Sequence, residues 1–372
     1  MNRNCWRRYI GCFLLGLIGM MLSAQPISVG PFTAGHCQGI AVDEQRGHVY
    51  YSFTTMLLKT DMQGKVLGSV TGLLGHLGCL TFNEADGRIY GSLEYKMDEI
   101  GRGILEREGV QRQLPNAWYI AIFDGSRITR EGMDYTEAGV MNAVYLPTVV
   151  ADYEATVERQ TQRYGCSGID GVSFGPAFGS ADGKRYLTCA YGIRGDTTRT
   201  DNDYQVLLQY DITDWRTRYE RPLGQDSMHQ SGPAQPKGKY FVYTGNTNWG
   251  VQNLVYDVRH NWWMLFVYPG KKSRFTNHSL YVVDSSIAPQ ETALKGMPPG
   301  EKGLTLALLA QGLHDARTGI YGWESPYGAL GSTTLSDGSF LLVEPTQSPA
   351  GEGAILHRYQ WTGEKPVPFK EK

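Results

Sequence analysis

The chain has 372 residues, of which 35 are Lys or Arg and 37 are Asp or Glu, and its formal net charge is −2 at pH 7. It lacks the excess of basic residues that binds a phosphate backbone, so we expect no nucleic-acid partner. Hydrophobic residues make up 41% of the chain, and its 46 glycines and 23 tyrosines are typical of many short strands joined by tight turns.

The first 24 residues have the pattern of a secretory signal. Three arginines precede an apolar run at about 9–22, and Ser23 and Ala24 follow it. The run is too short for a membrane span. We therefore expect an exported protein, periplasmic or extracellular, with no transmembrane helix after signal removal. Removal changes the formal charge from −2 to −5, because three arginines and no acidic residue are lost.

A repeated frame organises the rest of the chain, 25–372. In residues 36–61 an apolar run, a polar turn closed by Gly47 and two further apolar runs follow one another. The further copies begin at His76, Tyr327, Gly165 and His229. Five copies of a meander of short antiparallel strands predict a radial β-repeat, that is, a propeller.

Residues 36–61 resemble one repeat of the NHL/SMP-30-like group of β-propellers, whose units read Gly-Ile-Ala-Val-Asp, then Gly, then an aromatic strand. The resemblance covers most of the chain and implies the fold rather than an activity. His36 stands where that pattern usually has proline, and this departure is the first hint of function. We expect an all-β, single-domain propeller of six blades, with five or seven as alternatives.

The predicted blades follow one another along the chain, with two insertions that lie on one face. The blades are expected at 36–70, from residue 76, at 165–223, at 229–268, at 270–326 in degenerate form, and at 327–369. The insertions are expected at about 94–117 and 125–163, the second with a strand at 141–146 and a helix around 149–160. A strand at 27–30 is expected to close the ring.

Histidines, acids and amides gather at one predicted rim. In a four-stranded blade, the loop before the innermost strand and the loop between strands two and three share a rim, so distant residues converge there. The candidate catalytic residues are His36, His76, His229, Glu94 and Tyr164. The candidate substrate-binding residues are Lys96, Asp196, Arg199, Asp201, Asn246, Asn248, Trp249, His278 and Tyr327.

Each of these candidates also has a purely structural interpretation. A single histidine before a strand commonly hydrogen-bonds neighbouring backbone, whereas three in register favour a site. Glu94 and Lys96 would share a strand face, as an acid–base pair or as an ordinary salt bridge. Residues 196–203 alternate acids with hydroxyls, as in a calcium loop or a self-bonded turn. Trp249 is a sugar platform or a blade-edge aromatic.

Metal and disulfide chemistry remain open at this stage. If His36, His76 and His229 face the axis, they could ligate Zn²⁺ or Mn²⁺, with Glu94 or an Asp as fourth ligand. Four cysteines follow the signal, and up to two disulfides are possible in an oxidising compartment. The cysteines are Cys37, Cys79, Cys166 and Cys189. The pair Cys37–Cys79 is plausible, because both lie near the start of a predicted innermost strand.

The sequence has no nucleophile elbow, zinc-protease helix, phosphate loop or dinucleotide fingerprint. The first hypothesis is an exported carbohydrate-active enzyme, a hydrolase or uronate-type lyase, with axial histidines as bases and Arg199 as the cation. The alternative is a non-catalytic exported propeller that binds a glycan or a protein partner. A metal-dependent, lactonase-like hydrolase is third. Lactonase-like propellers hold calcium with axial acids and amides, whereas the predicted strand entries here are mainly histidine and tyrosine.

Overall fold

The computed structural model describes residues 26–180, 182–224, 228–246 and 248–372. The predicted signal lies outside these ranges. Among the helices within them, none is long and apolar enough to cross a membrane.

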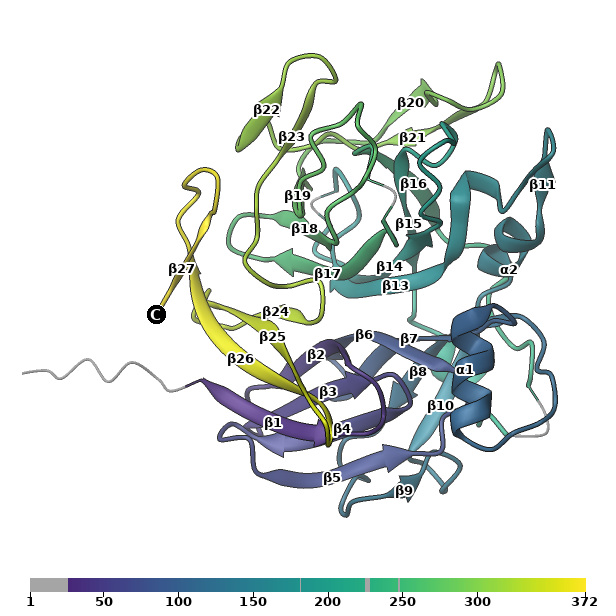
Figure 1. Ribbon diagram of the computed structural model, residues 1–372, viewed down its shortest axis with the longest axis vertical. Helices are drawn as coiled ribbons and strands as arrows, with labels where there is room; N and C mark the ends of the chain where they lie inside the picture. The colour runs from purple at the N-terminus through teal and green to yellow at the C-terminus, as the bar shows by residue number, and fades with distance from the viewer. Residues whose placement is uncertain (1–25, 181, 225–227, 247) are drawn as a thin grey trace, which may run out of the picture.

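Five mainly antiparallel sheets surround one axis, and the strands nearest the axis form a closed ring (Figure 1). These innermost strands are β2 (Cys37–Asp43), β6 (His76–Asn83), β13 (Cys166–Gly175), β17 (Val251–Asp257) and β24 (Ser332–Thr334). Each contacts the next along the chain, and β24 contacts β2. The chain is therefore a single β-propeller with five blades, and the preference for six blades was wrong.

Blades one and two follow the sequence repeat closely. Blade one contains β2, β3 (His48–Phe53), β4 (Met56–Asp61) and β5 (Val66–Thr71), with the two-residue β9 (Met133–Asp134) beside β5. Blade two contains β6, β7 (Arg88–Tyr95), β8 (Ala117–Phe123) and β10 (Met141–Tyr145). Gly47 and Gly87 close the first turns with φ of +66° and +69°. Glycine recurs there because it adopts positive φ without steric cost.

The stretches predicted as insertions hold most of the helical structure. Helix α1 (Glu99–Arg107) lies between β7 and β8, and Asp98 caps it by accepting a hydrogen bond from the Gly101 amide. Helix α2 (Pro147–Glu154) follows β10 and is shorter than the helix expected around 149–160. A small hairpin, β11 (Thr156–Val157) with β12 (Gln160–Thr161), and the turn η1 (Arg163–Gly165) lead into blade three.

Blades three and four differ from the prediction in which outer strands belong to each blade. Blade three contains β13, β14 (Tyr186–Ile193), β15 (Tyr204–Tyr210) and β16 (Gly238–Tyr243). Blade four contains β17, β18 (Trp262–Val267) and β19 (Leu280–Asp284), and a short helix α3 (Trp215–Arg218) lies between β15 and β16 of blade three. Residues 229–243, predicted to open blade four, therefore lead into the outermost of the four blade-three strands.

Residues 270–326 do not form a blade of their own. They supply β19, then β20 (Gln290–Ala293) and β21 (Lys302–Thr305), which extend the blade-three sheet, and a hairpin of β22 (Leu313–Asp315) with β23 (Ile320–Gly322). All four residues of β20 are exposed, and β21 alternates exposed with half-buried residues. These strands bury too little apolar surface to pack between two blades, so they remain at the edge.

The two ends of the described chain meet in the last blade, as expected. Blade five contains β24, β25 (Phe340–Ser348) and β26 (Gly351–Trp361), and the N-terminal β1 (Ile27–Phe32) pairs with β26. A short C-terminal strand, β27 (Phe369–Glu371), pairs with the other end of β26. This exchange closes the ring with hydrogen bonds between segments from the two ends of the described chain.

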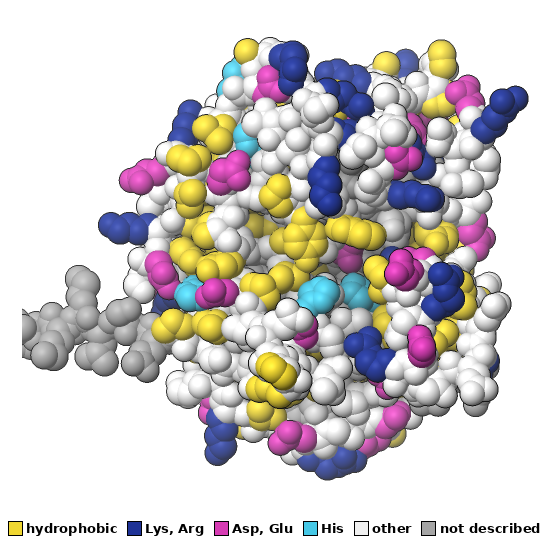
Figure 2. Space-filling view, in the orientation of Figure 1, with side chains coloured by type: hydrophobic (Ala, Val, Ile, Leu, Met, Phe, Trp, Pro, Cys, Tyr) yellow, Lys and Arg dark blue, Asp and Glu magenta, His cyan; other side chains and the backbone are white. Residues whose placement is uncertain are grey.

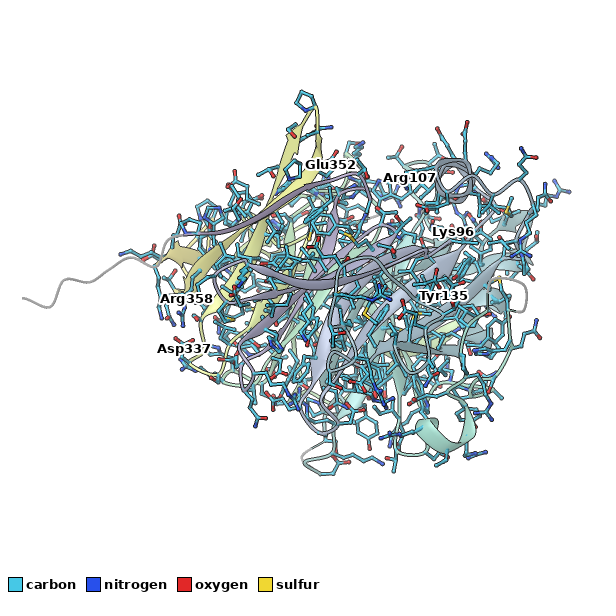
Figure 3. All side chains as sticks on the ribbon, turned by 90° about the horizontal axis from the view of Figure 1, so that it is seen from below. Lys96, Arg107, Tyr135, Asp337, Glu352 and Arg358 are labelled. Atoms are coloured by element: carbon cyan, nitrogen blue, oxygen red, sulfur yellow. The ribbon has the colours of Figure 1, made fainter. Side chains whose placement is uncertain are left out.

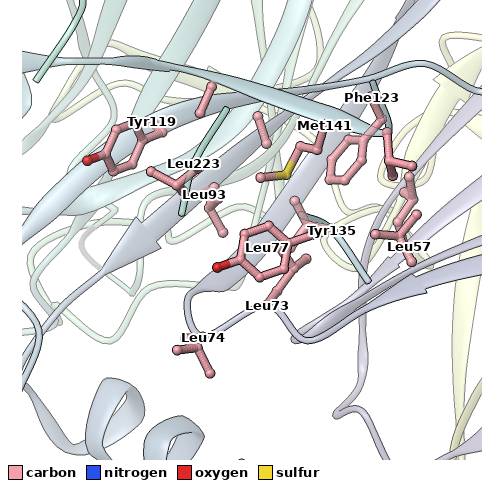
Figure 4. Close-up of a cluster of buried hydrophobic side chains, with 14 of the residues drawn as sticks. Leu57, Leu73, Leu74, Leu77, Leu93, Tyr119, Phe123, Tyr135, Met141 and Leu223 are labelled. Carbon is pink, nitrogen blue, oxygen red and sulfur yellow. The ribbon is translucent and has the colours of Figure 1, made fainter. Parts of the chain in front are cut away.

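The core lies between neighbouring blades rather than at the axis. Figure 4 shows the cluster between blades one and two, where Leu57, Leu77, Leu93, Phe123 and Met141 are all buried. Strands covered on both faces read as continuous apolar runs, and all seven residues of β8 are buried accordingly. Each fully buried side chain of this size contributes about 1.5–3 kcal/mol.

The four described cysteines are buried and free. The Cys37 sulfur faces the Gly39 carbonyl of its own strand, whereas the Cys79 sulfur faces the Val172 carbonyl of blade three. The two side chains therefore belong to different inter-blade clusters, and the plausible Cys37–Cys79 disulfide is not formed. Burial raises the pKa of Cys37 to about 12 and that of Cys79 to about 11.

Candidate functional site

Four innermost strands contain a β-bulge near the start of the strand. The strand register shifts at Gln38 in β2, at 78–79 in β6, at 170–171 in β13 and at Gln252 in β17. A bulge turns a side chain away from the normal strand alternation. Gln38, Asp170 and Gln252 accordingly line a cavity at the centre of this rim.

The cavity has a volume of about 780 Å³. Blades one and two contribute His36, Thr54, His76, Glu94 and Lys96, and blades three and four contribute Ser167, Asp170, Trp249, Gln252, Tyr268 and Lys271. One side of helix α1 completes the wall. Figure 2 shows histidine side chains beside hydrophobic ones near the middle of this face, with basic side chains around them.

Glu94 and Lys96 form a buried ion pair at the blade-two wall. The Lys96 Nζ lies 2.7 Å from Glu94 Oε1 and donates to the Ser167 carbonyl at 3.0 Å. The Trp118 Nε1 donates to Glu94 Oε2 at 3.1 Å, and His76 Nδ1 lies 3.5 Å from Oε1. Burial raises the pKa of Glu94, but Lys96 and His76 outweigh it and hold the pKa below its ordinary value. Glu94 is therefore an anchored, ionised carboxylate.

Asp170 is the second carboxyl group of the cavity and the main residue that sequence reasoning missed. The Gln252 Nε2 donates to Asp170 Oδ2 at 3.1 Å. Burial, followed by repulsion from Glu94, raises the pKa of Asp170 to about 7. The carboxyl group fits against Gly192, where an added Cβ would lie 2.9 Å from Oδ2. Asp170 can therefore hold or release a proton near neutral pH.

Close packing also fixes Glu94 next to blade three. Gly168 has a φ of +118°, and an added Cβ there would collide with Glu94 Oε2 and Trp118 Nε1. Only glycine combines this backbone conformation with the absence of a side chain. The glycine thus brings the β13 backbone against the carboxylate and closes it off from solvent.

His36 contributes a neutral imidazole. Its Nε2 lies 2.8 Å from the Gln38 amide nitrogen, which only donates, so Nε2 accepts this hydrogen bond. Burial, with a smaller effect of His76, lowers the pKa of His36. The ring is therefore uncharged at neutral pH, and its one acceptor nitrogen is engaged by the Gln38 amide.

His76, Glu94 and Asp170 are the one group within the described ranges whose three ligand atoms lie within 4.8 Å of one another. The trio expected for a metal does not form, because His229 lies elsewhere. The Lys96 ammonium contacts Glu94 Oε1, the same oxygen that faces His76. A divalent ion at this point would face that ammonium, so the cluster suits proton transfer better than Zn²⁺ or Mn²⁺.

Several predicted residues lie away from the cavity because their segments belong to outer strands or other loops. His229 precedes the outer strand β16, packs on the Tyr119 ring and lies 3.3 Å from the Arg221 carbonyl. Tyr164 donates to Glu301 in a separate hollow. Arg199 is paired with Asp201 at 2.8 Å.

The four other predicted residues outside the cavity lie in a surface turn, in the buried interior or in blade five. Asp196 accepts hydrogen bonds from Thr198, which is the self-bonded turn rather than a calcium loop. His278 is fully buried before β19, and Asn246 is buried and donates to the Tyr268 carbonyl. Tyr327 stacks on the His357 ring in blade five.

The cavity thus receives His36, His76, Glu94, Lys96, Asn248 and Trp249 from the predicted set. Trp249 is 46% exposed and lies two residues before the innermost strand β17, instead of lying between the second and third strands of its blade. One signal for Asp170 was available: it is a charged residue inside an apolar innermost strand, between Gly168-Ile169 and Gly171-Val172. Nothing comparable marked Gln252, Arg107 or Lys271.

A scan against protein-family models and a search of curated proteins found no match. Among solved structures, a GH43 β-1,3-galactosidase with galactodeoxynojirimycin matches with a TM-score of 0.42 and 12% identity, covering 92% of this chain and 97% of that one. A luciferin-regenerating enzyme matches with a TM-score of 0.36 and 10% identity, covering 93% of this chain and 79% of that one. A periplasmic gluconolactonase of Pseudomonas aeruginosa matches with a TM-score of 0.35 and 12% identity, covering 91% of this chain and 83% of that one. Similarity at this level carries no activity over to the chain.

Proposed function

We propose that the protein is a carbohydrate-active enzyme that cleaves a saccharide in the central cavity by general acid–base catalysis. The observation that carries this proposal is the pair of carboxyl groups Glu94 and Asp170. They lie in one cluster with His76, yet one is held ionised by Lys96 while the pKa of the other is raised to about 7. Two carboxyl groups with pKa values pushed apart are typical of an acid–base site.

The cavity residues divide into reacting and positioning groups. Asp170 is the proton donor, because burial keeps its carboxyl group protonated up to about neutral pH. His36 is the proton acceptor, because its imidazole is neutral and its Nε2 becomes available when a bound ligand takes over the Gln38 amide. Glu94 is only 4% exposed and both its oxygens are engaged, so it acts as a positioning residue that keeps the pKa of Asp170 raised.

The rim supports a saccharide as the ligand. Trp249 exposes its indole beside Asn248, and the Gln38 and Gln252 amides lie deeper in the cavity. An aromatic face with amide donors around it matches a sugar ring, which has apolar faces and hydroxyl edges. The volume of about 780 Å³ suits a short oligosaccharide rather than a single small metabolite.

Two reactions are compatible with these groups, and their products differ. In hydrolysis, Asp170 protonates the glycosidic oxygen as its bond to carbon breaks, while His36 takes a proton from the attacking water. In β-elimination beside a carboxylate, His36 takes the proton on the adjacent carbon and Asp170 protonates the leaving oxygen, which leaves an unsaturated sugar.

A glycan panel with two detection channels tests the proposal. The purified protein is incubated with neutral and acidic oligosaccharides while reducing ends and ultraviolet absorbance are followed. Hydrolysis raises reducing ends alone, and elimination raises both signals. Binding without either product would replace the proposal with the glycan-binding alternative, and neither binding nor product would refute both. We also propose, from residues 1–24, that the protein acts after export.

A further inference from the structure

Two basic side chains at the mouth of the central cavity have no acidic partner within the described ranges. Arg107, in the last turn of α1, and Lys271, between β18 and β19, are exposed and line the cavity. No ion pair joins either to a carboxylate of the residues that the structure describes. The neighbouring Lys272 is different, because it is buried and paired with Asp203.

The charges deeper in the cavity are already balanced. Lys96 neutralises Glu94 at 2.7 Å, and Asp170 accepts a hydrogen bond from Gln252 in place of a cation. The remaining ionic groups of the wall are Arg107, Lys271 and Glu99, of which two are positive. The mouth therefore carries a positive excess, although the whole chain has a formal charge of −2.

The two cations come from different parts of the cavity wall. An added Cβ at Gly35 would lie 3.6 Å from an Arg107 guanidinium nitrogen, so Arg107 stands over the entry of blade one. Figure 3 shows Arg107 and Lys96 on the same side of the molecule. Lys271 comes from blade four, which also supplies Trp249 and Tyr268. Arg107, Lys271 and Trp249 thus line the same cavity, where one bound ligand can contact all three.

We infer that the cavity takes an acidic oligosaccharide and that Arg107 and Lys271 bind the carboxylates of its uronic-acid units. The inference rests on the proposed function, since it names the substrate class of the same site. A guanidinium donates two parallel hydrogen bonds to a carboxylate. A flexible ammonium can donate to a neighbouring carboxylate whose position varies. Both side chains are determinants of specificity, not of proton transfer.

Paired ligands that differ only in charge test this inference. Oligomers of galacturonate and of glucuronate are compared with their methyl esters, which keep the sugar rings and remove the charge. Affinities are measured by calorimetry on the Asp170→Asn background, which prevents turnover, and melting curves verify that each variant is folded. We expect the acids to bind at least roughly tenfold more tightly than the esters.

Variants assign the effect to the two side chains. Arg107→Gln and Lys271→Gln should each weaken binding of the acids by roughly tenfold and leave binding of the esters unchanged. Arg102→Gln is the matched control, because it removes the same charge from α1 at an exposed residue that does not line the cavity. Equal affinity for acids and esters, or equal effects of the three variants, would overturn the inference and leave the proposed function intact. Absence of binding by every oligosaccharide, neutral ones included, would overturn both.

Discussion

The two walls of the central cavity shift the pKa of a buried carboxyl group in opposite directions. At the blade-two wall, Glu94 is buried but faces the Lys96 ammonium and the Trp118 indole N–H, and it stays ionised. At the facing wall, the neutral Gln252 amide is the one hydrogen-bond donor to the Asp170 side chain among the described residues, and the pKa of Asp170 rises to about 7. Desolvation acts on both groups, so the presence of a cation decides which of them keeps its proton.

The largest effect is expected from removing the titrating group itself. Asp170→Asn keeps the shape and the Gln252 contact but cannot donate a catalytic proton. We expect kcat on the saccharide substrate to fall by about 10²–10⁴-fold, with the melting temperature unchanged or raised. Asp196→Asn is the control, because that carboxylate lies in an exposed self-bonded turn. A decrease as large in the control, or none in Asp170→Asn, would contradict the assignment.

Removing the cation makes the blade-two wall resemble the opposite one. Lys96→Met leaves Glu94 buried without its partner, and we expect a loss of about 3–5 kcal/mol in the free energy of unfolding. Chemical denaturation measures this loss. Lys271→Met should change stability by less than about 0.5 kcal/mol, because that lysine is exposed and unpaired. The double variant Lys96→Met with Glu94→Gln should recover much of the loss. A fully additive double variant would mean that the two charges do not interact.

The raised pKa of Asp170 also predicts how stability varies with pH. Its folded-state pKa of about 7 lies above the unfolded value of about 3.9. The protonated carboxyl group therefore contributes fully below pH 4, and this contribution is lost as pH rises through 7. We expect the unfolding free energy to decline by about 3 kcal/mol between pH 4.5 and 7.5. Asp170→Asn should remove this decline, and an unchanged slope in that variant would assign it to another group.

The smallest effect is expected where a histidine meets carboxylates in solvent rather than in the cavity. His357 lies 2.7 Å from both Glu344 and Glu371. Burial lowers its pKa, but hydrogen bonds with Glu371 and Glu344 outweigh burial and raise the pKa above its ordinary value. This stabilisation is present below about pH 6.5 and is lost as pH rises through the raised value. We expect less than about 1 kcal/mol, because both glutamates are well exposed.

Melting curves of His357→Gln at pH 6 and pH 9 measure this contribution. The variant should be less stable than the native chain at pH 6 and equal to it at pH 9. His314→Gln is the matched control, since His314 stacks on Tyr321 without a carboxylate partner. A pH-dependent change in the control as large as in His357→Gln would show that the paired glutamates are not the cause.

The regular blades were readable from the sequence because their information is local. The run ending at Asp43, the turn at Gly47 and the strand His48–Phe53 were all found as predicted. The ring closure by a strand at 27–30 was also expected, and β1 pairs with β26 of the last blade. Strand periodicity and turn glycines act over a few residues, so a single sequence suffices to reveal them.

The number of blades and the blade to which each strand belongs depend on how segments far apart in the sequence pack and bury one another. Gly238–Tyr243 reads like the second strand of a new blade, yet it pairs with Tyr204–Tyr210 and completes blade three. Residues 270–326 contain strands but no apolar segment that reaches the axis. Whether a strand lies inside or at the edge depends on what covers it, and a repeat pattern does not contain that information.

The sequence alone determined that a histidine-rich rim exists, because His36 and His76 stand at the entries of two well-matched repeats and Glu94 follows a recognisable strand. The tertiary structure alone decided which partners meet them there. It placed Asp170 and Gln252 on bulges of two other blades and moved His229 to an outer strand. The position of a bulge and the burial of a carboxyl group arise from packing between blades, and these set the pKa values on which the proposed chemistry depends.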